Sequence, residues 1–115
     1  TIDDSVFWTL MSRVQCCDKD EGRMSMNNIR LSPDECRIVL FMINEKYIPA
    51  LKTAFIDIPI MDGIDADEYD DLLVHIIAKG SEFYHGMIAS PIISLYLCDQ
   101  FYPIYTWLNQ LSGYN

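Results

Sequence analysis

The clearest constraint on the fold is the stretch LSPDE at residues 31–35, which carries several helix-start signals at once. Ser32 is a favoured N-cap residue, Pro33 suits the first helical turn, and Glu35 follows Ser32 at the spacing of a capping box. The apolar-rich segment CRIVLFMINEKY comes next, so a helix is expected from the proline onward. Pro49 should kink or end this helix, after which ALKTAFI resumes as a short one.

The N-terminal segment predicts a first helix that packs through one face. Asp3 and Asp4 are suitable cap residues, and the apolar positions after them recur at helical spacing. The expected buried stripe is Val6, Phe7, Leu10, Met11 and Val14. Residues 15–27 are mostly polar and contain Gly22, so a loop is expected there.

The second half of the chain predicts three more helices. One covers about residues 67–79, with Asp65 or Asp67 as its cap. It ends before Gly80, a favoured residue just past a helix C-terminus. The next has the sequence SEFYHGMIA, and the last opens at Pro91 and should be bent by Pro103. No segment alternates convincingly between apolar and polar residues as a strand would. The sequence therefore predicts an all-α fold, a compact single-domain bundle of about five helices with proline kinks in the second and the last.

Two stripes are expected on the predicted helix at residues 67–79. The buried stripe is Tyr69, Leu72, Leu73, Ile76 and Ile77, and the polar stripe is Glu68, Asp71, His75 and Lys79. His75 follows Asp71 by about one helical turn. We therefore expect a surface histidine whose pKa is raised by the neighbouring carboxylate.

The charge of the chain limits the partners that it can bind. Residues 1–115 have the length of one domain, and half of them are hydrophobic, which suffices for a packed core. Seventeen acids against eight bases give a formal charge of −9. This balance disfavours nucleic acids and anionic membranes, whose phosphates attract Lys and Arg, and it favours a basic partner. After Lys52 the chain has one base, Lys79, against nine acids.

The acids concentrate in DGIDADEYDD, residues 62–71. Its carboxylates are Asp62, Asp65, Asp67, Glu68, Asp70 and Asp71. A capped, solvated helix start explains Asp65, Asp67 and Glu68, because acids interact favourably with that end of the helix dipole. It explains Asp70 and Asp71 less well, since like charges at this density repel. The alternatives are a docking surface for a basic protein and a calcium site, although the spacing lacks the glycine and the late Glu of an EF-hand.

Aromatic residues extend the candidate binding surface. A small helical domain cannot bury all seven tyrosines, and exposed tyrosine is favoured at protein interfaces. The predicted partner-binding residues are the six carboxylates together with Tyr69, His75, Tyr84, Tyr102 and Tyr105. Basic residues of the partner would meet the carboxylates, and Tyr69 and the aromatic residues of the last helix would supply apolar anchors.

Catalytic and metal-binding patterns are weak in this sequence. Ser81 and Ser90 are the nucleophile candidates closest to His75, but no G-x-S-x-G elbow is present. His85 is interpreted as a partly buried polar residue. No C-x-x-C pair exists, and the adjacent pair Cys16–Cys17 has poor geometry for chelation. The sequence therefore predicts no enzyme, no cofactor and no metal site.

The cysteines and the start of the chain bear on its location. Asp3 and Asp4 stand where a signal peptide would have basic residues, so no signal peptide is predicted. The charge-free run at residues 83–98 is too short and too interrupted by glycine and proline to span a bilayer. The four cysteines are Cys16, Cys17, Cys36 and Cys98. We expect them to be reduced thiols in a cytoplasmic protein.

Three landmarks line up along the chain. They are the pair Phe7-Trp8, the pattern D-x-x-x-x-I-I-x-x-G at residues 71–80, and Phe83-Tyr84 followed seven residues later by Pro91. Together they resemble the DUF4240 family of small bacterial helical domains, over about residues 3–92. This chain has Val74 where that family typically has Trp. Proteins similar to the family occur beside secreted bacterial toxins, so the resemblance implies an immunity role.

We therefore predict a cytoplasmic, non-enzymatic immunity protein that neutralises a cognate basic bacterial toxin by direct contact. Toxins that cut nucleic acid are commonly basic, and a small acidic domain can block them through steered association and complementary charge. The alternative is a helical adaptor or regulator that binds an amphipathic partner helix in a hydrophobic groove, with little dependence on salt. The sequence leaves the oligomeric state open.

Overall fold

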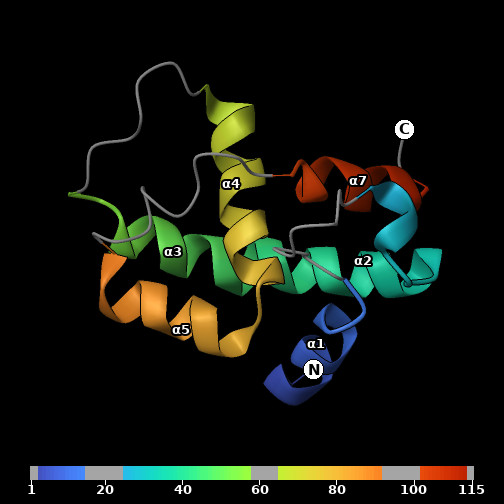
Figure 1. The fold of residues 1–115 in the computed structure, drawn as a ribbon, viewed down its shortest axis with the longest axis horizontal. Helices are drawn as coiled ribbons and strands as arrows, with labels where there is room; N and C mark the ends of the chain where they lie inside the picture. Colours follow the sequence, from blue (N-terminus) through green and yellow to red (C-terminus); the bar gives the residue numbers. More distant parts are fainter. Residues whose placement is uncertain (1–2, 15–24, 58–64, 92–101, 114–115) are drawn as a thin grey trace.

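Helices form nearly all of the regular structure in the described part of the chain (Figure 1). This computed structural model describes residues 3–14, 25–57, 65–91 and 102–113. Its α-helices are α1 (Asp4–Met11), α2 (Pro33–Met42), α3 (Ile48–Ala54), α4 (Ala66–Ala78), α5 (Ser81–Ala89) and α7 (Ile104–Leu111). A 3₁₀ turn, η1 (Met26–Asn28), precedes α2, and a π-helical turn, η2 (Ile43–Tyr47), joins α2 to α3. These residues contain an isolated bridge, Val14–Ile29, and no strand, so the predicted all-α fold is confirmed.

The segments α2, η2 and α3 follow one another without a break and form one helical rod (Figure 1). The rod begins with the predicted capping box, in which Glu35 N–H donates to Ser32 Oγ and Ser32 N–H donates to Glu35 Oε1. Pro49 was expected to kink or end this helix, and the structure shows that it does not end it. The helix widens directly before the proline, where Ile48 N–H donates to Ile43 O. A proline removes one N–H and crowds the preceding turn, and the π turn accommodates both effects.

The last helix differs from its prediction. Of the helix expected from Pro91 onward, residues 92–101 lie outside the described part. α7 begins at Ile104, directly after Pro103, which is its N-cap residue. Pro103 therefore precedes this helix and does not bend it, because a proline is tolerated at a helix start, where the N–H needs no partner. The loop expected at residues 15–27 also lies largely outside the described residues, and η1 begins at its end.

Helix α4 packs against α3, α5 and α7 and lies between them (Figure 1). Every residue from Leu72 to Ala78 is buried. The expected division into a buried and an exposed stripe therefore fails in this half of the helix. His75, predicted on the polar stripe, is 4% exposed. A helix that neighbours cover on all sides has no solvent-facing stripe, so its polar residues must find partners inside the protein.

Helix α1 begins as predicted at Asp3, whose carboxylate accepts the Val6 N–H at 3.0 Å. Most of the expected stripe is buried, with Phe7 and Leu10 among its members. Val6 was wrongly included, because it lies in the first turn and is 45% exposed.

An aromatic cluster of Phe7, Trp8, Tyr47 and Tyr84 joins α1 to the rod and to α5. Phe7 stacks on Tyr47 with ring centroids 4.1 Å apart. Trp8 and Tyr84 pack edge-on against Tyr47 at 5.2 and 5.3 Å. The Tyr84 hydroxyl donates to the Tyr47 carbonyl at 3.3 Å, and the Tyr47 hydroxyl donates to Asp4. The start of α1 is thereby fixed against two other helices.

Gly80 makes the turn between α4 and α5 with φ +115° and ψ 169°. Backbone in this region is essentially restricted to glycine. The residue follows the C-cap of α4, as predicted, and it is also the N-cap residue of α5. A Cβ atom built on Gly80 would meet no other atom within 4 Å, so the restriction comes from the backbone alone.

Replacing Gly80 with alanine is expected to lower the free energy of unfolding by about 1–3 kcal/mol, the cost of the strained backbone. Gly86 is a matched control, because a Cβ there also meets nothing within 4 Å but the residue lies inside α5. Gly86→Ala should raise the free energy of unfolding by roughly 1 kcal/mol. Urea denaturation measures both values, and a Gly80→Ala variant at least as stable as the unmodified protein would contradict the strain at Gly80.

Candidate functional site

The acidic start of α4 partly serves the helix itself. Asp65 Oδ1 accepts the Glu68 N–H at 2.9 Å, and Glu68 Oε1 accepts the Asp65 N–H at 3.2 Å. Of the two expected cap residues, Asp65 and Asp67, Asp65 is the one that caps the helix, and the capping box gives two of the carboxylates a structural role. Asp67 is exposed in the first turn. Asp62 lies outside the described residues.

Asp70 connects α4 to α3. Its carboxylate lies 3.4 Å from the Lys52 ammonium, and the same ammonium lies 5.9 Å from the centre of the Tyr69 ring. Both side chains of the ion pair remain partly exposed. A pair of this kind contributes at most about 1 kcal/mol to stability, so a partner can compete for Asp70 at little cost.

Asp71 has a role that the sequence did not indicate. Helix α7 starts after Pro103, which has no side-chain acceptor for the first N–H groups of the helix. Asp71 Oδ1 accepts the Thr106 N–H at 3.1 Å, and the Thr106 hydroxyl lies 3.2 Å from both carboxylate oxygens. Asp71 therefore caps α7 from a neighbouring helix. Burial raises the pKa of Asp71, and the hydrogen bonds from Thr106 oppose that shift.

His75 holds the same end of α7, one turn farther along α4. Its Nδ1 accepts the backbone N–H of Tyr102 at 3.2 Å, so the neutral ring carries its proton on Nε2. Burial lowers the pKa of His75 to about 4, with a smaller contribution from Lys79. The prediction of a surface histidine with a raised pKa is therefore wrong. Removal of water from the buried ring outweighs the attraction expected from Asp71.

Tyr69 and Tyr105 lie beside these carboxylates. Burial raises the pKa of both tyrosines, and the charge of Asp70 adds to both shifts, as that of Asp71 does for Tyr105. The Tyr105 hydroxyl donates to Asn44 at 2.6 Å, which joins α7 to the rod. The structure thus brings together part of the predicted site. These residues, referred to as the acidic–aromatic surface, are Asp67, Tyr69, Asp70, Asp71 and Tyr105.

Two other predicted partner-binding tyrosines lie elsewhere. Tyr84 is buried in the aromatic cluster, and burial raises its pKa to about 12. Tyr102 is partly exposed and packs on His75 with ring centroids 5.7 Å apart. Tyr84 and His75 were wrongly included among the partner-binding residues, because both side chains are buried between helices.

The pair Ser81 and His85 is unsuited to nucleophile activation. His85, expected to be partly buried, is exposed, and its Nδ1 lies 2.8 Å from the Ser81 carbonyl oxygen and 3.2 Å from Ser81 Oγ. A carbonyl only accepts, so Nδ1 carries the proton and cannot take one from the hydroxyl. Cys36 is buried, and burial raises the pKa of its thiol. Within the described ranges, no three His, Cys, Asp or Glu side chains are grouped to hold a metal ion.

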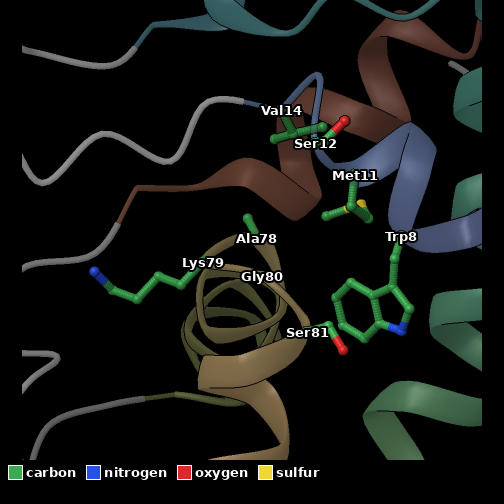
Figure 2. A pocket seen from close by; sticks show the side chains of 8 residues that line it. All are labelled: Trp8, Met11, Ser12, Val14, Ala78, Lys79, Gly80 and Ser81. Carbon is green, nitrogen blue, oxygen red and sulfur yellow. The ribbon is translucent and has the colours of Figure 1, made fainter.

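An open pocket of about 380 Å³ lies between the end of α1 and the turn from α4 to α5 (Figure 2). Residues that line it include Trp8, Met11 and Val14 on one side and Ala78, Gly80 and Ser81 on the other. Figure 2 shows Trp8 and the Lys79 side chain on opposite sides of the turn. The Lys79 ammonium lies 5.3 Å from the centre of the Phe83 ring. The volume is at the lower end of the range for ligand-binding pockets.

Comparison of the chain with protein-family models, curated proteins and solved structures finds no match. The resemblance to the DUF4240 family therefore stays a prediction that depends on the landmarks in the sequence. None of the helices in the described residues is long and apolar enough to cross a membrane.

Proposed function

We propose that this protein is a binding protein whose acidic–aromatic surface recognises a basic protein partner. The main support is the gathering of carboxylates and partly exposed tyrosines from α4 and α7 on one packed framework. Carboxylates attract and orient a basic partner. Tyrosines supply large contact areas at a low entropic cost, because few rotatable bonds must be fixed.

The distribution of ion pairs supports the same proposal. Several bases of the described chain are already paired with acids away from this surface, in the pairs Arg13–Glu35, Arg37–Asp34 and Lys46–Asp4. Of the five carboxylates at residues 65–71, only Asp70 forms an ion pair within the described structure, and its partner is Lys52. A Lys or Arg side chain from a partner would relieve the repulsion among them.

The more specific form of this proposal is a cytoplasmic immunity protein, without enzymatic activity, that neutralises a basic bacterial toxin. It is supported by the acidic charge of the chain and by the resemblance to the DUF4240 family. The alternative, a helical adaptor that binds an apolar partner segment, is favoured by one observation. The pocket beside Trp8 offers a place for an apolar side chain.

Asp67→Lys is expected to weaken binding of the partner, captured from the native source, by about tenfold at low salt and by much less at high salt. Asp67 is the second residue of α4 and is exposed, so the change leaves the capping box intact. Glu82 is the second residue of α5 and is also exposed, which makes Glu82→Lys a matched control with the same change in charge.

Calorimetric titration of the captured partner at two salt concentrations compares these variants. Binding that depends on salt and on Asp67, but not on Glu82, is the expected outcome. Equal weakening by both variants would assign the effect to net charge and contradict the proposed surface. An affinity that changes neither with salt nor in either variant would favour the adaptor instead.

A further inference from the structure

Two backbone N–H groups, one in α7 and one two residues before it, attach the start of this helix to α4. Tyr102 N–H donates to His75 Nδ1 at 3.2 Å, and Thr106 N–H donates to Asp71 Oδ1 at 3.1 Å. The two acceptors stand four residues apart on α4, and the two donors stand four residues apart along the other segment. The attachment therefore acts at two successive turns of α4.

When His75 is protonated, the proton binds to the atom that accepts the hydrogen bond from Tyr102. Nδ1 is the unprotonated nitrogen of the neutral His75 ring, so a proton taken up by this ring must go there. The ring would then present an N–H group to the N–H group of Tyr102, and the hydrogen bond would be lost. We propose that His75 is a pH-sensitive clamp, which holds the start of α7 against α4 while the ring is neutral and releases it when the ring is protonated.

The surroundings of His75 oppose a charged ring in the closed state. Burial removes the water that would solvate an imidazolium, and Lys79 on the same helix repels it. Together they lower the pKa of His75 to about 4. Asp71, which would attract the charge from the turn before, is occupied by the N–H and hydroxyl groups of Thr106. A proton is therefore taken up much more readily once α7 has moved away.

Within the described residues, the elements packed against α4 bring few charges. Their titratable or charged groups are Tyr102 and Tyr105 in the α7 segment, Lys52 on α3, and Glu82, Tyr84 and His85 on α5. Lys52 is paired with Asp70, and the Tyr102 ring packs on the imidazole itself. Opening of α7 would also move Tyr105 out of the acidic–aromatic surface, but the clamp does not depend on the proposed function.

Amide hydrogen exchange between pH 7 and pH 5, followed by NMR, tests the clamp. After correction for intrinsic exchange rates, the opening constant of α7 amides should rise about 15-fold from pH 6.5 to pH 5. This factor follows from one proton whose pKa is about 4 when α7 is docked and 6.5 when it is released. At each pH, α7 should open more readily than α2, because release does not require global unfolding. Identical opening constants for α7 and α2 would overturn the proposal.

Two variants assign the effect to one ring. His75→Asn keeps an acceptor near the position of Nδ1 but cannot be protonated, so the pH dependence of α7 opening should disappear. His85→Asn replaces the other histidine of the chain, which is exposed, and it should retain the full dependence. Dependence that persists in His75→Asn, or vanishes in His85→Asn, would overturn the clamp.

A direct titration covers the case in which His75→Asn does not fold at pH 7. The ring nitrogens of His75 are then followed by NMR in the unmodified protein. Protonation of Nδ1 well below pH 6.5, together with the separate opening of α7, supports the clamp. A midpoint at or above 6.5 would show that α7 does not disfavour the charged ring, and the proposal would be wrong.

Discussion

Replacing Tyr47 with alanine is expected to lower the free energy of unfolding by about 3–5 kcal/mol, the range for removing a buried aromatic ring. The ring lies in the aromatic cluster, stacked on Phe7 and flanked by Trp8 and Tyr84. These neighbours come from α1 and α5, so neither helix can fill the cavity without moving away from the other. Urea denaturation at pH 7 measures the loss.

Tyr47→Phe distinguishes the contribution of the ring to stability from that of its hydroxyl group. Phenylalanine keeps the stacking on Phe7 and removes the hydrogen bond to Asp4. The loss of stability should be much smaller than for alanine, because water and Lys46 remain to solvate the exposed Asp4 carboxylate. Equal losses in the two variants would show that the hydroxyl, and not the packing of the ring, stabilises this cluster.

Acidification from pH 7 to pH 5 is expected to lower the free energy of unfolding by about 2 kcal/mol through His75. The pKa of the ring is about 4 in the folded protein, against 6.5 for an ordinary histidine, so the unfolded chain binds the proton first. The stability contributed by the neutral ring is therefore present above pH 6.5. It is lost as the pH falls toward 4, where the total loss approaches about 3 kcal/mol.

Asp71 contributes with the opposite sign. Burial raises its pKa above 3.8, so acidification relieves the cost of its buried charge. The difference between the unmodified protein and His75→Asn removes this contribution, because both contain Asp71. Urea denaturation at pH 7, 6 and 5 should give a falling free energy of unfolding for the unmodified protein only. Parallel curves for the two proteins would mean that His75 is not responsible.

Helix starts were predictable because a cap depends on residues within one turn. Asp3, the Ser32–Glu35 box and Asp65 all form the hydrogen bonds that their spacing indicated. The position of Gly80 after α4 was predictable for the same reason. The response of the helix to Pro49 was not, since the sequence offers several ways to accommodate a proline and packing selects among them.

The roles of Asp71 and His75 could not be predicted from local sequence patterns. Their partners lie 35 and 27 positions away, so helical periodicity could only assign both residues to a solvent-facing stripe. One signal was present in the sequence. A helix that begins after Pro103 lacks a side chain to accept its first N–H groups, so an acceptor from another element was to be expected.

The π turn η2 sets the rotational phase between the two halves of the rod. Each residue of an α-helix turns the chain by about 100°, and a π turn holds one residue more than an α turn. Deleting one residue from 43–47 would let this segment close as an ordinary α turn, with nearly the same orientation of α3 relative to α2. If all five residues adopted α-helical geometry instead, the extra residue would rotate α3 by about 100°, and Lys52 would turn away from Asp70.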